Sequence, residues 1–288
     1  MKEKLLMLVL ISFIISCEME KEIEYDYVFD NESIVVHGFI TVNGVEAVVR
    51  KTVSPLKDYG SSYLENANVL LIENYNKQIK LIEKDSGFFA TPDSFVPEVN
   101  YPYILKVEAN GFKTVTSSPQ SIPDTVKIDS VQFIKASSSS KIFNIIINIT
   151  KGDNDHENGY YYKYFRFQNG QNFDIENYNE IFNPYGLISY NEMELSDNRI
   201  ILENIYLKEF NASNYFDSIK IEIFNLSEDL QKFLSSIIDY ESTKDDPWYG
   251  QPLPVYSNIV NGYGIFSSYS LNVKTIKIDT LELFQDEK

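Results

Sequence analysis

The side chains that could do chemistry are few, and an acidic loop holds the best candidates for binding a metal. Residues 151–159 read Lys-Gly-Asp-Asn-Asp-His-Glu-Asn-Gly, with carboxylates at Asp153, Asp155 and Glu157. Hard oxygen ligands of this kind are those that calcium prefers. The segment lacks the twelve-residue pattern that ends in a bidentate glutamate. We therefore expect a solvated hairpin loop and no cofactor, with a calcium site as the alternative.

Other catalytic side chains are sparse. His37 and His156 are the only imidazoles, and His37 lies in the middle of an expected strand beside Gly38, which favours a core or edge position. Paired carboxylates of the glycosidase kind are recognised by their separation in space, and no spacing in this acidic chain singles out a pair. No glycine-rich phosphate loop is present. We expect a protein that is not an enzyme, with a carboxylate-based hydrolase as the lesser alternative.

Composition excludes several classes of protein. The 288 residues include 42 acidic and 25 basic side chains, a net charge of −17, and 43% of the residues are hydrophobic. Duplex binding needs clustered Lys and Arg, which this balance does not supply, so we expect no nucleic-acid partner. A single cysteine excludes an intramolecular disulfide framework. The apolar fraction is sufficient for a packed core.

That single cysteine, Cys17, follows a segment typical of an export signal. Lys2 and Lys4 precede a nearly all-apolar stretch at residues 5–16, which is too short to span a membrane. Residues 14–17, Ile-Ile-Ser-Cys, resemble a bacterial lipobox. The resemblance implies cleavage after residue 16, a diacylglyceryl thioether on Cys17, and acylation of the new amine by a fatty acid such as palmitate. Two or more acyl chains would anchor the protein stably; the alternative is a buried cysteine in an ordinary signal peptide.

We expect residues 17–32 to form an acidic tether. This segment carries seven carboxylates against one lysine, and such a run repels itself and stays extended. It resembles the surface-export signals of Bacteroidota lipoproteins, which implies a lipid anchor in the outer membrane and a protein that faces the exterior. The alternative is a solvated linker that faces the periplasm.

From residue 33 onward, alternation of apolar and polar residues predicts antiparallel strands. The clearest runs are 103–109, 143–149 and 218–223, and Asn-Gly or Ser-Gly pairs such as Asn43-Gly44 and Ser86-Gly87 predict the turns between strands. One segment differs: apolar residues at 230, 233, 234, 237 and 238 predict an amphipathic helix near 228–240, behind Ser227 as N-cap. We expect this helix to close one end of a sheet.

The strands fall into two blocks, divided where prolines interrupt them between Pro119 and Pro123. The strand order in 33–120 resembles the small transthyretin-like or carboxypeptidase-regulatory-like sandwich. Residues 124–288 are expected to form a second β-rich domain that carries the helix. The predicted fold class is therefore mainly β, with an N-terminal sandwich followed by a β-rich domain.

The C-terminal block contains the most specific run of the chain. Residues 246–252 read Asp-Pro-Trp-Tyr-Gly-Gln-Pro, 254–259 read Pro-Val-Tyr-Ser-Asn-Ile, and 261–266 read Asn-Gly-Tyr-Gly-Ile-Phe. Together with the lipobox and residues 35–40, they resemble the Bacteroidota lipoprotein family catalogued as domain of unknown function 4249. The resemblance implies an outer-membrane lipoprotein whose genes often neighbour TonB-dependent transporters, and it carries over no catalytic residues.

The aromatic residues of this run have two interpretations. Trp248, Tyr249, Tyr256 and Tyr263 could pack over the end of the sandwich, or they could form an exposed edge on which a sugar or peptide stacks. Pro247, Pro252 and Pro254 stiffen the backbone between them, because proline fixes φ.

These observations together predict a non-enzymatic surface lipoprotein. We expect it to associate with a TonB-dependent outer-membrane transporter and to aid substrate capture or uptake, because a shared membrane raises the effective concentration of two partners. The alternative is a structural or adhesive lipoprotein of an envelope assembly.

Overall fold

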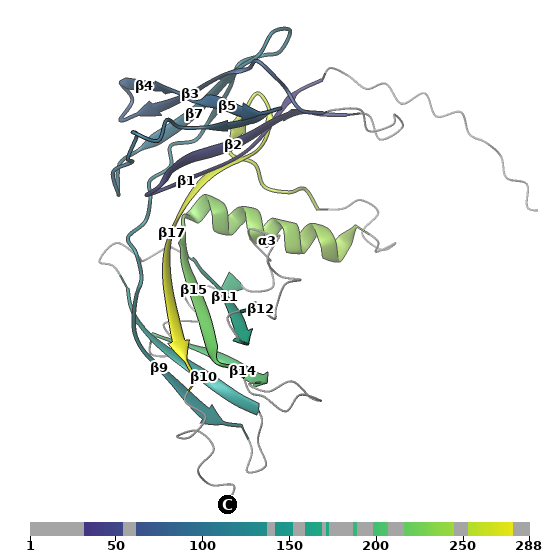
Figure 1. Cartoon of the computed structure of the whole chain (residues 1–288). Helices are drawn as coiled ribbons and strands as arrows, with labels where there is room; N and C mark the ends of the chain where they lie inside the picture. The colour runs from purple at the N-terminus through teal and green to yellow at the C-terminus, as the bar shows by residue number, and fades with distance from the viewer. Residues whose placement is uncertain are drawn as a thin grey trace, which may run out of the picture. The chain divides into compact units, whose positions relative to one another are not determined.

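β-Strands account for most of the chain that the computed structural model describes (Figure 1). The described residues are 32–53, 62–136, 142–151, 159–168, 171–172, 187–188, 198–206, 216–244 and 253–278. This architecture confirms the predicted mainly β fold class. In the described residues no helix has both the length and the apolar run needed to cross a membrane.

The described strands form three sheets. The largest has the order β12-β11-β15-β17-β1-β2-β6-β5, with β13 beside β11. Its strands are β1 (Ile34–Thr41), β2 (Gly44–Lys51), β5 (Ile82–Asp85), β6 (Phe88–Ala90), β11 (Gly159–Gln168), β12 (Gln171–Asn172), β13 (Leu187–Ile188), β15 (Ser218–Leu226) and β17 (Tyr263–Lys277). The second sheet, in the order β16-β8-β7-β3-β4, contains β3 (Asn68–Glu73), β4 (Lys77–Lys80), β7 (Tyr103–Glu108), β8 (Val115–Ser117) and β16 (Ile259–Val260). The third sheet, in the order β14-β10-β9, contains β9 (Lys127–Lys135), β10 (Ile142–Thr150) and β14 (Arg199–Tyr206).

Alternation in the sequence determines which face of each strand is buried. In β10, buried residues alternate with partly exposed ones until Thr150, and β7 and the first half of β15 show the same pattern. The predicted strands over 103–109, 143–149 and 218–223 are therefore confirmed. The turns predicted at Asn43-Gly44 and Ser86-Gly87 connect β1 to β2 and β5 to β6.

Two hydrophobic cores lie against the largest sheet. The first joins residues of β1, β2 and β6 to residues of β3, β7 and β8, which makes the N-terminal part a β-sandwich. The second joins β11 and β15 to β9, β10 and β14. β17 contributes to both: Phe266 is buried in the first core and Ile276 packs against the second.

β17 pairs with β1 in parallel, although the sequence pattern predicts antiparallel strands. Val36 faces Gly264 and Gly38 faces Phe266 in this register. Gly264 has φ = +104°, and a Cβ atom there would overlap the carbonyl oxygen of Val36. Only glycine satisfies both conditions, which gives the Gly-Tyr-Gly run at 262–264 a structural reason. The pairing also joins the first predicted block to the second.

The predicted helix is present as α3 (Glu228–Thr243). Leu230 and Leu234 are buried against Phe224 and Leu226 of β15 and Tyr161 of β11. The stripe therefore packs on the face of the largest sheet. Ser227 is the N-cap residue, but its side chain makes no capping hydrogen bond.

A ladder of side-chain bonds holds residues 121–128 against β17. Ser268 Oγ donates to Ser121 O at 2.6 Å, Ser270 Oγ to Asp124 O at 2.8 Å, and Asn272 Nδ2 to Val126 O at 2.8 Å. The donors are alternate residues and so share one face of the strand. Ile122 is buried in the first core and Val126 in the second. The segment that sequence marks as a division is thus held by β17 along its length.

Candidate functional site

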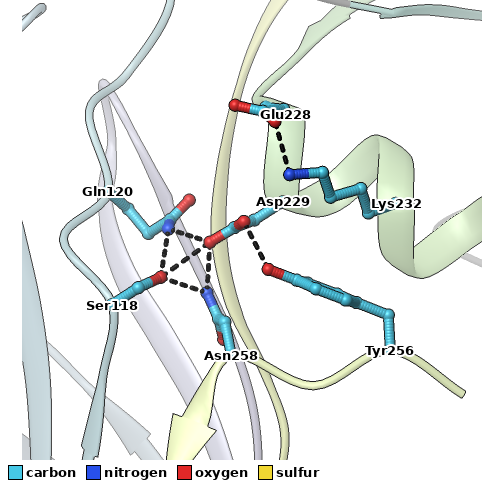
Figure 2. A network of polar contacts seen from close by, with 7 residues as sticks. All are labelled: Ser118, Gln120, Glu228, Asp229, Lys232, Tyr256 and Asn258. Carbon is cyan, nitrogen blue, oxygen red and sulfur yellow. Dashed lines mark hydrogen bonds and ion pairs between the residues drawn. The ribbon is translucent and has the colours of Figure 1, made fainter.

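A single carboxylate, Asp229, joins four polar side chains in one network. Its Oδ2 atom accepts hydrogen bonds from Ser118 Oγ at 2.7 Å, Gln120 Nε2 at 2.6 Å and Asn258 Nδ2 at 2.8 Å. Its Oδ1 atom accepts one from the Tyr256 hydroxyl at 2.6 Å. Figure 2 shows Ser118 and Gln120 approaching Asp229 from one segment, and Tyr256 and Asn258 from another. The network therefore ties α3 to two separate stretches of backbone.

The position of Asp229 at the start of α3 stabilises its negative charge. Asp229 lies in the first turn of α3, where the free N–H groups and the helix dipole favour negative charge. Ser118 and Gln120 follow β8 and lie 111 and 109 positions from Asp229 in sequence. Backbone bonds of 2.8 Å in both directions between Gln120 and Tyr103 hold that segment on the second sheet. The network thus connects the helix to the N-terminal sandwich.

Asn258 connects the network to β17 as well. Its Nδ2 atom donates to Phe266 O at 2.7 Å, and its Oδ1 atom accepts from Phe266 N at 3.0 Å. The same Nδ2 group donates to Ser118 Oγ at 2.9 Å. Asn258 and Gln120 are 8% and 4% exposed. Buried polar groups of this kind are costly unless they are bonded, and these hydrogen bonds satisfy them.

The network shifts the pKa values of its two ionisable members in opposite directions. Burial raises the pKa of Asp229, but hydrogen bonds from Tyr256, Ser118, Asn258 and Gln120 outweigh it and hold that pKa below its ordinary value. Burial, followed by the bond to the Asp229 carboxylate, raises the pKa of Tyr256. Asp229 is therefore an anion and Tyr256 a neutral phenol at neutral pH.

The hydrogen bonding of Asp229 suits a structural role better than a catalytic one. We call Asp229 and its four partners, Ser118, Gln120, Tyr256 and Asn258, the clamp. A carboxylate offers about four acceptor positions, and Asp229 accepts four bonds from protein side chains. Three of these bonds converge on Oδ2 and one reaches Oδ1, so protein side chains take most of the acceptor capacity of this carboxylate. Its low pKa also makes it a poor general base at neutral pH.

Beside this network lies an open groove of about 480 Å³ between α3 and Tyr256 of the segment 253–258. Its lining residues are Glu228, Gln231, Lys232, Ser235, Ser236, Asp239 and Tyr256. The six residues from α3 follow helical spacing and so share one face of the helix, away from buried Leu230 and Leu234. Ion pairing between Glu228 and Lys232 spans one turn of this face (Figure 2).

The opposite wall of the groove is attached to the helix at two further points. Leu253 N donates to Thr243 Oγ1 at 3.0 Å, and Tyr256 N donates to Ser236 Oγ at 2.8 Å. Together with Tyr256 and Asn258 at Asp229, these bonds hold the segment from the C-terminal to the N-terminal end of α3. The chain therefore runs antiparallel to the helix axis.

The structure places two of the four predicted edge aromatics, and their surroundings differ. Tyr256 is partly buried and bonded to Asp229, whereas Tyr263, the first residue of β17, is 58% exposed. Trp248 and Tyr249 lie outside the described residues.

The other predicted site residues also lie outside the described part of the chain. These are the lipidation residue Cys17 and the calcium candidates Asp153, Asp155 and Glu157. In the ranges that are described, no three His, Cys, Asp or Glu side chains are grouped as a metal site requires.

His37 occupies the partly buried strand position that the sequence favours. It lies in β1, and its ring centroid is 6.2 Å from that of Phe233 on α3. Burial, with a smaller contribution from the charge of Arg50, lowers the pKa of His37. The neutral imidazole therefore serves as packing between the sheet and the helix.

Fold and site define a β-sandwich protein in which a polar clamp fixes one amphipathic helix. Comparison with protein families gives a match to the Domain of unknown function (DUF4249) over residues 18–275. The match covers most of the chain, and the protein belongs to this family. Comparison with curated proteins gave no match.

From the sequence, Asp229 is predicted only as part of the helix near 228–240, and Asn258 only as part of the C-terminal run. Neither prediction identifies Ser118 or Gln120 as a partner. A hydrogen bond between residues more than 100 positions apart leaves no signal in local periodicity.

Proposed function

We propose that this protein is a lipid-anchored lipoprotein of the outer membrane that assists a TonB-dependent transporter without catalysing a reaction itself. Support for the anchor comes from the pattern around Cys17, and support for an outward orientation from the acidic tether at 17–32. The transporter is proposed because the family resemblance implies it. In this role the protein captures or retains the solute that the transporter imports.

The observation that carries the non-catalytic part of the proposal is the state of Asp229. Four protein donors surround this carboxylate and its pKa is low, so it fixes α3 and residues 253–258 rather than transferring protons. Rigid surfaces of this kind favour binding, because little conformational entropy is lost when a partner or solute docks.

Affinity purification from the native bacterium tests the proposal. A C-terminally tagged chain, extracted in mild detergent, should fractionate with the outer membrane and recover a TonB-dependent transporter. Mass spectrometry should find Cys17 acylated. The Cys17→Ser variant is the matched control and should lose both the acyl chains and the membrane association.

Two results would contradict the proposal. An unmodified thiol at Cys17 in the mature protein would remove the anchor. A membrane-bound protein that recovers other envelope components, but no transporter, would support the structural or adhesive alternative.

A further inference from the structure

The groove along α3 has the features of a binding site for an elongated, hydroxyl-rich ligand. Its helical wall runs over the twelve residues from Glu228 to Asp239, and the eleven rises between them span about 16 Å at 1.5 Å per residue. The groove is open along this face and holds about 480 Å³, a volume within the range of small-molecule sites.

Tyr256 supplies an aromatic wall whose position is fixed before any ligand arrives. Its hydroxyl is bonded to Asp229 at 2.6 Å and its backbone N–H to Ser236 at 2.8 Å. Lys232 Nζ lies over this ring, 6.0 Å from its centroid. A ligand that stacks on this face takes the place of the ammonium, which keeps its ion pair with Glu228, and the ring itself needs no ordering because its position is already fixed.

The polar side chains along the helical wall match hydroxyls. Gln231, Ser235 and Asp239 offer amide, hydroxyl and carboxylate groups along the helical wall. Glu228 and Lys232 neutralise each other in an ion pair, so the lining residues carry a net charge of about −1 from Asp239. This charge disfavours an anion. A neutral saccharide has the hydroxyl edges that the polar lining can bond and the apolar C–H faces that can stack on Tyr256.

A peptide fits less well. Peptides that add to a protein as extended strands require free backbone N–H groups on the receiving segment. On the segment that forms the second wall, the N–H groups of Leu253 and Tyr256 are bonded to Thr243 and Ser236 of α3. The groove therefore presents side chains rather than backbone to a ligand.

We infer that the groove between α3 and residues 253–258 binds a neutral oligosaccharide, with Tyr256 as the stacking wall and Gln231, Ser235 and Asp239 as hydroxyl partners. The inference rests on the proposed function in one respect, because it names the chemical class of the solute to be captured.

Calorimetric titration of the full mature protein tests it. The detergent must not contain sugar, since glucosides and maltosides would compete for the groove. The probes are cellotetraose, maltotetraose, xylotetraose and chitotetraose, with tetragalacturonate as the anionic comparison and tetra-alanine as the peptide comparison. At least one neutral tetrasaccharide should bind saturably, and tetragalacturonate and tetra-alanine should not.

Variants then place the binding in the groove. Tyr256→Ala and Asp239→Ala should each weaken binding about tenfold, whereas Tyr256→Phe, which keeps the ring, should stay within about threefold. Ser235→Tyr should block the groove without touching the clamp, which covers the case in which Tyr256→Ala fails to fold. Asp93→Asn is the matched control, because Asp93 lines a second cavity of about 280 Å³ and the substitution should not change affinity.

Three outcomes would overturn the inference: no binding by any neutral tetrasaccharide, tighter binding by tetra-alanine, or unchanged affinity in both Asp239→Ala and Ser235→Tyr. The titration contains no transporter. Failure here is therefore distinct from failure to recover a transporter in the purification.

Discussion

At the scale of single residues, Asp229 joins parts of the chain that local structure does not connect. Its four hydrogen bonds reach the segment after β8 and the segment before β16, and Asn258 extends them to the backbone of β17. Hydrogen bonds to a charged group contribute more than bonds between neutral groups, and a partner left unsatisfied in a buried place is costly.

Replacing Asp229 with Asn should lower the free energy of unfolding by roughly 1–3 kcal/mol at pH 7. The amide keeps the size of the carboxylate, but its NH₂ group would face donors that now bond to oxygen. Urea denaturation of the variant measures the loss. Asp239→Asn, an exposed acid on the same helix, should change stability little and serves as the control.

The free energy of unfolding lost in Asp229→Asn should become smaller as the pH falls. Because the folded pKa of Asp229 lies below its ordinary value of about 3.9, the stabilisation is present above that pH and disappears as pH falls through the folded pKa. The difference between wild type and Asp229→Asn should therefore shrink below about pH 4. A constant difference from pH 7 to pH 3 would refute this account of the clamp.

At the scale of elements, β17 bonds through its side chains as well as its backbone. Its alternate polar residues donate to carbonyls of 121–126, a segment in which Pro123 has no N–H to donate. Asp124 O receives a second bond, from Asn225 Nδ2 at 2.8 Å. The bond to Val126 O, for which the structure gives one side-chain donor, therefore depends more strongly on that donor than the bond to Asp124 O does.

Asn272→Ala removes the bond to Val126 O and should therefore speed hydrogen exchange in residues 121–130. The increase should correspond to a loss of about 1–2 kcal/mol in the free energy of local opening. Ser270→Ala should have a smaller effect, since Asn225 still bonds Asp124 O. Exchange measured by mass spectrometry on peptides from this segment compares the two. Equal protection in wild type and Asn272→Ala would show that the ladder does not hold the segment.

At the scale of the whole molecule, β17 makes the two predicted blocks dependent on each other. It pairs with β1 of the first block and β15 of the second, and it contributes side chains to both cores. The boundary near 119–123 stays a prediction about domains, but a strand shared by both cores couples their unfolding.

We therefore expect a single unfolding transition. Ile147→Ala creates a cavity in the second core and should lower the free energy of unfolding by about 2–5 kcal/mol. If the two cores unfold together, amides in β7 of the first core should lose protection from hydrogen exchange as well as those in β10. Denaturation followed by circular dichroism and by hydrogen exchange measures both. Two separate transitions, with β7 unaffected, would show that 33–120 and 124–288 unfold independently.

Much of the local structure followed from the sequence because its causes are local. Alternation in residues 143–149 and 218–223 specifies strands with one buried face, and the spacing of Leu230 and Leu234 specifies the helix. The site was less predictable. Tyr256 was singled out as an aromatic edge residue, but its bond to Asp229 was not, because that bond depends on where the chain places α3.

Periodicity, turn residues and the motif at Cys17 determined the kinds of element and the expectation of a lipid anchor, since each depends on neighbours within a few positions. The tertiary structure decided which strands pair, that β1 and β17 run parallel, and that Asp229 meets Ser118. These contacts join residues far apart in sequence, and they form because burying both cores at once fixes the helix and β17 relative to the sheets.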